Sequence, residues 1–509
     1  MIKLGRFYIK VLIKTPLFFI SLLFAMFIFI VQLGALKHSS IVEYTNVICF
    51  AMISLNLYFL ISTSAVLAKR YEIMEFLEVD SFKKYLSIIF AGVIISLIVS
   101  LIPIAFIIVF RNSNISNYFF LKGIVNLFII LNLSNLISIV IGASIGILFR
   151  KWISIVVSLL IYSFFPLNLF NPVAQSNVIN KFLNIYGDST VIITNILCDE
   201  IFNILYLCDK LIILLAIGLI ILVIKILIDK KKKLLAIISS FVILVFMGLT
   251  ISVGMNSVSF IHEYDISKMD NLNYHISTYK MNLNIGNSFR NNVSFQLDID
   301  KPNDSIVLLL DDLFKINEVK INDSPTQFTH NNNEIILNYK SNDKEKIDIS
   351  ISYEEYIHVQ DSLGVDTFYC NNHEINLTDS FLWYPYINNK DFPINYTIKT
   401  NSLSTIYSNL DTKVEGNEYL LEGIAQTVSL FSGQYRDVFD EGIEYIIPSS
   451  YNLDNLKMDV DEFITDCINN SENDTSKLNE KKYKKVIVGM KVDNYSGIKL
   501  SGDVLLLDL

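Results

Sequence analysis

The chain has 509 residues, of which 52% are hydrophobic and 18% charged, and its formal net charge is −9. That total joins two unlike halves: residues 1–255 carry 20 Lys+Arg and 10 Asp+Glu, whereas residues 256–509 carry 21 and 40. Such an acidic second half excludes nucleic acid as a credible partner. The asymmetry, with the long apolar runs of the first half, predicts a membrane protein with a large polar domain on one side.

The first half opens with a basic amphipathic segment, residues 1–16, which we expect on the cytoplasmic side. Seven apolar segments follow, each close to or above the roughly 20 residues that cross a bilayer core. They are Leu17–Leu36, Thr45–Ala68, Tyr85–Phe110, Gly123–Phe149, Trp152–Phe170, Leu211–Leu227 and Leu234–Val253. We therefore predict a bundle of seven transmembrane helices, with a six-helix membrane domain over residues 17–233 and a seventh helix within residues 234–255.

The cations orient this bundle. With a cytoplasmic N-terminus, the segments on the inside hold 15 Lys+Arg and the outside loops before the acidic half hold 5. Cytoplasmic loops are the ones enriched in Lys and Arg, so this asymmetry predicts that residues 256–509 lie outside the cell. The first span is too long for a cleaved signal peptide and reads as an anchor. The composition, rich in Ile, Asn and Lys, favours a bacterial plasma membrane.

Two connecting segments carry patterns of their own. Residues 70–84 are charged, yet Ile73, Phe76 and Leu77 recur at helical spacing, which predicts a short helix on the cytoplasmic surface. It could dock a cytosolic partner or rest on lipid headgroups. The outside loop 171–210 mixes polar residues with many Ile and Leu, which predicts short re-entrant helices at the membrane surface.

The fourth span has a stripe of small and polar residues, and no Asp, Glu, His or Arg lies in the middle of any span. This absence argues against a proton- or ion-coupled carrier. The stripe contains Asn132, Asn135, Ser138, Gly142 and Gly146. It could line a translocation path, but the Gly142–Gly146 spacing favours close helix packing.

The second half alternates short strands with turn residues, which predicts an antiparallel β-sandwich or saddle over residues 256–468. Clear examples are the alternating segments 292–299 and 346–353. A polar linker follows, and residues 469–509 contain two further strands. We expect these residues to begin a truncated second domain.

The layout of residues 1–230 resembles the permease subunit of ATP-binding-cassette (ABC) exporters of the second type. That resemblance makes residues 72–84 the coupling helix that contacts a cytosolic ABC ATPase, although Asp80 stands where the family often has Pro. The residues assigned to this contact are Glu72, Ile73, Glu75, Phe76, Leu77, Glu78 and Phe82. The chain has no GxxxxGK[ST] motif, so it binds no cofactor itself, and ATP is expected on the partner. The resemblance also implies a homodimer or pairing with a related permease.

The second half resembles the non-catalytic N-terminal β-domain of the aminopeptidase-N family of zinc peptidases. The matching segments are 305–323, 349–353, 383–385, 432–435, 483–490 and 501–508. The family's HExxH is missing: His373-Glu374 is followed by Ile375-Asn376-Leu377, and GxMEN is missing too. We therefore expect no metal site and no enzymatic activity in this chain. Two alternatives stay open, the membrane-anchored half of a split zinc aminopeptidase, and a membrane-tethered sensor or scaffold.

Overall fold

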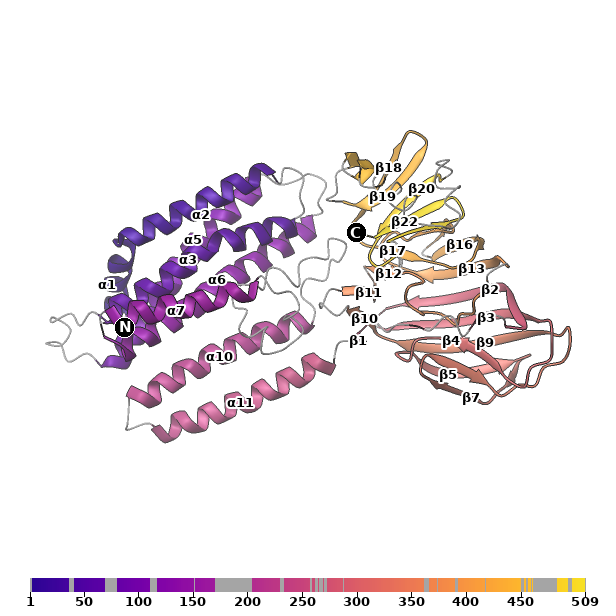
Figure 1. Cartoon of the computed structure of the whole chain (residues 1–509), viewed down its shortest axis with the longest axis horizontal. Coiled ribbons are helices and arrows are strands. Elements are labelled where there is room, and N and C mark those ends of the chain that lie inside the picture. Colours follow the sequence, from indigo (N-terminus) through magenta and orange to yellow (C-terminus); the bar gives the residue numbers. More distant parts are fainter. Residues whose placement is uncertain are drawn as a thin grey trace. The chain divides into compact units, whose positions relative to one another are not determined.

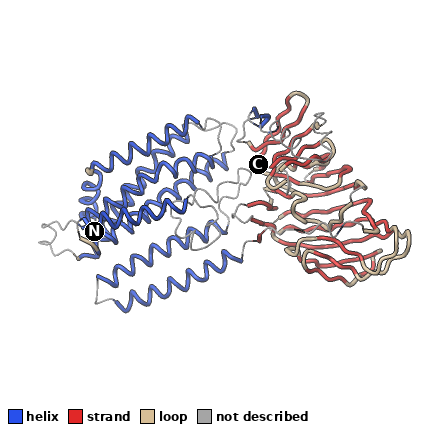
Figure 2. The backbone as a smooth tube through the Cα atoms, in the orientation of Figure 1, coloured by secondary structure: helices blue, strands red, loops and turns tan. Residues whose placement is uncertain are grey.

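The computed structural model describes most of the chain. The described residues are 2–35, 41–68, 80–109, 117–150, 152–169, 204–228, 233–256, 259–260, 264, 269, 272–286, 288–360, 366–372, 374–389, 392–416, 418–449, 453–454, 456–458, 460, 483–492 and 497–508. They divide into two compact units, which meet in sequence at residues 258 and 259. The first consists of helices and the second is mainly β, as Figure 2 shows. We call them the helical unit and the β unit.

The helical unit follows the apolar segments of the sequence. Its helices, labelled in Figure 1, are α1 (Ile2–Ile13), α2 (Pro16–Ala35), α3 (Ile41–Ala68), α5 (Ser81–Val109), α6 (Asn117–Leu148), α7 (Trp152–Leu169), α10 (Ile204–Ile228) and α11 (Lys233–Asn256). Each predicted span overlaps one of these helices. Of the predicted surface helix, residues 70–79 lie outside the described residues, and the last four residues belong to α5.

Within the described residues, three helical stretches are long and apolar enough to cross a membrane. They are Ser81–Val109, Phe120–Leu148 and Lys210–Ile228. A fourth is added if the bent pair α1 and α2 counts as one span. Shorter apolar stretches occur at Ser54–Ala68, Trp152–Ser163 and Ala236–Ser252. The chain therefore contains a helical region with three to four clear candidate spans, and the predicted total of seven stays a prediction.

The core of the helical unit is built by α3, α5 and α6. Asn56 on α3 bonds Ser134 on α6, and further along both helices Gly146 of α6 lies against Ser64 of α3, so these two helices run parallel. Tyr85 near the start of α5 bonds Ser144 near the end of α6, so that pair is antiparallel. Large apolar side chains stay exposed on the outer helices, which suits a lipid surrounding.

The described strands of the β unit form four sheets. Their strands are β1 (Ser259–Phe260), β2 (Tyr274–Ile285), β3 (Phe289–Ile299), β4 (Ile306–Leu309), β5 (Lys315–Ile321), β6 (Ser324–Pro325), β7 (Phe328–Asn331), β8 (Glu334–Leu337), β9 (Lys346–Glu355), β10 (Ile357–Gln360), β11 (Asp366–Cys370), β12 (Ile375–Leu377), β13 (Ile394–Asn401), β14 (Tyr407–Ser408), β15 (Asp411–Glu415), β16 (Glu418–Ala425), β17 (Leu430–Ser432), β18 (Tyr435–Asp440), β19 (Ile443–Pro448), β20 (Lys485–Gly489), β21 (Ile498–Ser501) and β22 (Val504–Asp508). The largest sheet has the order β15-β16-β13-β2-β3-β9-β5-β6.

Alternation of buried and exposed residues produces the central strands. In β9, Ile347, Ile349 and Ile351 face the core while the residues between them are polar. Two tight turns use Asn or Asp at positive φ, Asn322-Asp323 after β5 and Asn332-Asn333 after β7. These residue types tolerate the left-handed conformation that such hairpins require.

The prediction of a purely antiparallel arrangement is wrong for several pairs. β13 pairs with β2 in parallel, β1 with β10, and β20 with both β19 and β22. Hairpin turns indicate antiparallel neighbours only for strands adjacent in sequence. β2 and β13 are separated by about a hundred residues, so no turn signal encodes their pairing.

The last sheet, β18-β19-β20-β22-β21, joins strands from both sides of the predicted boundary at residues 468 and 469. It is docked on the rest of the β unit by side chains of β12 and of the residues directly after it. Asn376, Thr378 and Ser380 donate to the carbonyls of Met490, Lys491 and Val492 respectively. Every second residue of this segment thus holds the same strand end.

Candidate functional site: a polar seam in the helical unit

A line of neutral polar side chains runs between α5 and α6. Asn132 accepts a hydrogen bond from Ser96 at 2.8 Å and donates to Ser100 at 3.1 Å, and its amide also donates to the carbonyl of Phe128. Asn135 donates to Ser96 at 2.9 Å. Both asparagines singled out in the sequence therefore meet Ser96, and Asn132 also meets Ser100. We call this set of four residues the polar seam.

The seam continues on both sides with residues that the sequence reasoning missed. Asn56 of α3 donates to Ser134 at 2.8 Å, and Tyr85 of α5 lies 3.0 Å from the Ser144 hydroxyl. Ser158 of α7 donates to Ser64 of α3 at 3.0 Å. The sequence carries a signal for the two serines of the seam, since Ser96 and Ser100 recur at helical spacing in α5. It does not say which neighbour they meet.

The two glycines of the stripe lie where α6 touches the backbone of α3. A Cβ on Gly146 would stand 2.5 Å from the Ser64 carbonyl oxygen and 2.9 Å from the Ser64 Cα. A Cβ on Gly142 would meet Thr63 and the backbone of Leu60 in the same way. Only a residue without a side chain permits this approach of the two helices.

Several buried polar atoms of the same three helices lack a hydrogen-bond partner within the described residues. Asn126 on α6 is 1% exposed, and neither its oxygen nor its nitrogen is bonded. The Oδ1 atoms of Asn56 and Asn135 and the hydroxyl of Ser87 are also without a partner. These groups can form hydrogen bonds with a neutral polar group or a water, but none of them titrates near neutral pH.

One end of the helical unit is basic. Gly5 of α1 lies against Phe90 of α5, so α1 packs on the first turns of that helix. The Nζ of Lys225, in the last turn of α10, is 5.5 Å from the Phe82 ring centroid. The described cations of these helix ends are Lys3, Arg6, Lys10, Lys14, Lys83, Lys84, Arg150 and Lys225.

Of the residues predicted to dock a partner, only Phe82 is described. It lies in the first turn of α5, half-buried, with its ring stacked on Tyr85 at 6.0 Å between centroids. The Asp80 carboxylate accepts a bond from the Phe82 backbone N–H and caps the helix. The other predicted docking residues, Glu72, Ile73, Glu75, Phe76, Leu77 and Glu78, lie outside the described residues.

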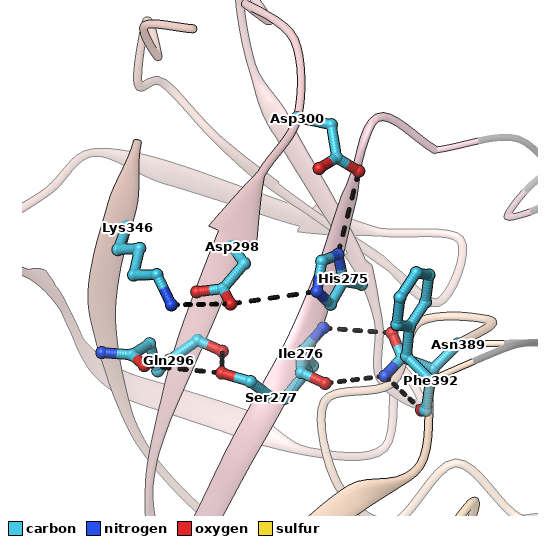
Figure 3. Close-up of polar contacts among 9 residues, drawn as sticks. All are labelled: His275, Ile276, Ser277, Gln296, Asp298, Asp300, Lys346, Asn389 and Phe392. Carbon is cyan, nitrogen blue, oxygen red and sulfur yellow. Dashed lines mark hydrogen bonds and ion pairs between the residues drawn. The ribbon is translucent and has the colours of Figure 1, made fainter. Parts of the chain in front are cut away.

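The described histidines of the β unit, His275, His330 and His358, lie beside carboxylates. His275 stands between Asp298 and Asp300, each 3.8 Å from a ring nitrogen, and its ring stacks on Phe392 at 4.1 Å (Figure 3). Asn389 beside it holds the β2 backbone through Ile276. Among the residues that the structure describes, no group of three or more His, Cys, Asp or Glu side chains could hold a metal ion.

A lysine links the last sheet to the rest of the β unit. Lys499 on β21 is in contact with the Asp379 carboxylate and donates to the Thr427 hydroxyl at 3.0 Å. Burial lowers the pKa of Lys499 to about 8, and the adjacent carboxylate opposes that shift. The aromatic residues at 383–386 form part of the core, since Trp383 is fully buried and packs on Tyr384.

No protein-family model and no curated protein matches this chain. Solved structures are similar to part of it. The M1 zinc metallopeptidase from Deinococcus radiodurans is 9% identical with a TM-score of 0.32, over 47% of this chain and 61% of that chain. The native leukotriene A4 hydrolase from Saccharomyces cerevisiae is 14% identical with a TM-score of 0.33, over 48% and 42%. The chain thus spans less than two thirds of either protein, and no activity is transferred from them.

Proposed function

We propose that this chain is the permease subunit of an ATP-driven exporter of the ABC type. Its seven helices cross a bacterial plasma membrane with the N-terminus in the cytoplasm. The β unit lies outside the cell, catalyses no peptide hydrolysis and shapes the exit of the substrate. ATP is bound and hydrolysed by a separate cytosolic subunit. A second permease, identical or related, completes the membrane pathway.

The observation that carries the proposal is the basic end of the helical unit. Close contacts bring together α1, the start of α5 and the ends of α6 and α10, and each of these segments supplies Lys or Arg. Cytoplasmic helix ends are the ones enriched in these residues. A helix that ends at the basic end of the unit is followed by a helix that starts at the same end. For example, α7 starts where α6 ends. This alternation supports a seven-span bundle with the β unit on the opposite side.

The N-terminal helix supports the permease layout. α1 and α2 are bent by 64° at a break of two residues, Lys14 and Thr15. Tyr8 and Leu12 of α1 are buried, and the Tyr58 hydroxyl of α3 donates to the Leu12 carbonyl at 3.0 Å. An amphipathic helix held across the base of the bundle matches the segment expected before the first span.

Energy must enter from a partner, because the polar seam offers only neutral side chains. Neutral amides and hydroxyls cannot couple transport to a proton by titration. The contact between Phe82 and Lys225 connects the first turn of α5 with the last turn of α10. Movement of a partner at residues 72–80 would therefore reach both helices at once.

The test is affinity purification of the full chain from its native membrane in mild detergent, followed by mass spectrometry and an ATPase assay. We expect an ABC ATPase to copurify. Replacing residues 72–80 with a Gly/Ser segment of equal length should abolish that association and the vanadate-sensitive ATPase activity. A matched control replaces the exposed residues 342–344 of the β unit in the same way and should retain both.

Each other result points elsewhere. Copurification that survives replacement of residues 72–80 contradicts the docking assignment. Recovery of a protein with HExxH in place of an ATPase, together with zinc-dependent release of amino-terminal residues from peptides, supports the split aminopeptidase. If neither protein is recovered and export is unchanged in a deletion strain, the chain is a membrane-tethered sensor or scaffold.

A further inference from the structure

We infer that α1 is a binding surface for anionic phospholipids. Its three cations, Lys3, Arg6 and Lys10, and Lys14 in the turn that follows it, succeed one another at spacings of three, four and four residues. Residues at these spacings share one face of a helix, so the cations form a single stripe. All four are exposed, and α1 contains no acidic residue.

Packing of the opposite face sets the rotation of α1. Gly5 touches Phe90 of α5, with a distance of 3.1 Å from an added Cβ to the ring. Tyr8 and Leu12 are 2% and 0% exposed. Because these three residues are anchored in the bundle, the cationic stripe has to point away from it. Among the described residues, no acidic side chain pairs with any of the four cations.

The surroundings of the stripe favour a lipid surface over a protein. α2 exposes large apolar side chains such as Leu23 and Phe27, at 69% and 65%, and so reads as a lipid-facing span. A helix bent by 64° from a span that follows the membrane normal lies closer to the membrane plane than to the normal. Phe7, 38% exposed beside the stripe, can enter the headgroup boundary while the cations meet phosphates. This inference requires a membrane location but not the exporter function.

The experiment uses the full chain, reconstituted in vesicles of phosphatidylglycerol and phosphatidylcholine and extracted with its nearest lipids in polymer-bounded discs. The measured quantity is the phosphatidylglycerol fraction around the protein relative to the bulk vesicle. We expect enrichment for the wild type that falls as salt is raised from about 0.1 M to about 1 M, since the screening length shrinks from about 10 Å to about 3 Å. Each cation is worth about a fivefold preference near the surface.

The decisive variant is K3Q/R6Q/K10Q/K14Q, and the matched control neutralises four exposed lysines of the β unit, K301Q/K340Q/K344Q/K413Q. Loss of enrichment in the first and its retention in the control supports the inference. A K3R/K10R/K14R variant, which keeps the charge, should behave as the wild type. Wild-type helical ellipticity of the K3Q/R6Q/K10Q/K14Q variant excludes misfolding as the cause. Absent enrichment in the wild type, or equal loss in the control, overturns the inference. So does a K3Q/R6Q/K10Q/K14Q variant that keeps the lipid but loses a copurifying ATPase, since the stripe would then serve a protein.

Discussion

Substitution of Gly146 by Ala tests the contact between α6 and α3 directly. The added Cβ would stand 2.5 Å from the Ser64 carbonyl oxygen and 2.9 Å from its Cα, whereas ordinary contact begins at 3.4 Å. The obstacle is backbone, so the helices must separate by roughly 0.9 Å. A gap of that size forfeits about a quarter to a half of the dispersion energy across the contact. Overpacking of this kind costs about 1–3 kcal/mol, offset by up to about 1 kcal/mol from the better helix propensity of Ala.

We therefore expect Gly146→Ala to lower the free energy of unfolding by about 1–2 kcal/mol. The control is Gly248→Ala on α11, where an added Cβ meets nothing within 4 Å and only the propensity gain remains. The assay follows helical ellipticity of the detergent-solubilised chain during denaturation by sodium dodecyl sulfate. The reasoning is refuted if Gly146→Ala is as stable as the wild type, or if the two variants shift the midpoint in the same direction.

Three further predictions concern buried polar groups. Asn132→Leu should lower the free energy of unfolding by about 1 kcal/mol, because it removes hydrogen bonds between helices. Asn126→Leu should leave the free energy of unfolding unchanged or raise it. Equal destabilisation by the two variants in the same denaturation assay would contradict this prediction. Burial raises the pKa of the Tyr279 hydroxyl well above 10.0, so the folded state holds the hydroxyl proton more tightly than the unfolded state. The stability that this difference contributes is lost as pH rises above 10. Tyrosinate absorbance should therefore rise together with unfolding of the β unit, and Tyr279→Phe should shift that unfolding transition to higher pH. Lys499 should change stability with pH in the opposite direction, because its lowered pKa makes the unfolded state bind more protons between pH 8 and 10.5, so stability should rise with pH in that window. The measurement is the slope of the free energy of unfolding against pH, and the same slope in Lys499→Met would contradict the prediction. Asp379→Asn should make that slope steeper.

The sequence alone was sufficient where the controlling interaction is local. Helix positions follow from apolar length, and the helices α2 to α11 overlap the predicted spans. Strands such as β9 follow from period-two alternation, and the turn at Asn332-Asn333 follows from residues that tolerate positive φ. The missed start of α5 at Ser81 has a local cause as well, because Asp80 caps a helix that was expected to begin at Tyr85.

Pairings between distant segments had no such signal. Asn126 and Asn132 cannot be distinguished in the sequence, because both are asparagines within the same apolar helix. Only the folded bundle places Asn132 between Ser96 and Ser100 and leaves Asn126 buried without a partner. The parallel pairing of β2 with β13 is of the same kind.

What the sequence determined about this protein is therefore its division into an apolar basic half and a polar acidic half, and the type of secondary structure in each. Those properties depend on composition and on periodicity within about twenty residues. The tertiary structure decided which polar groups meet across the bundle, which face of α1 stays exposed, and how β20 to β22 join β18 and β19. These outcomes depend on packing between segments that are far apart in the chain, where side-chain shape and backbone approach choose among many pairings that the pattern alone allows.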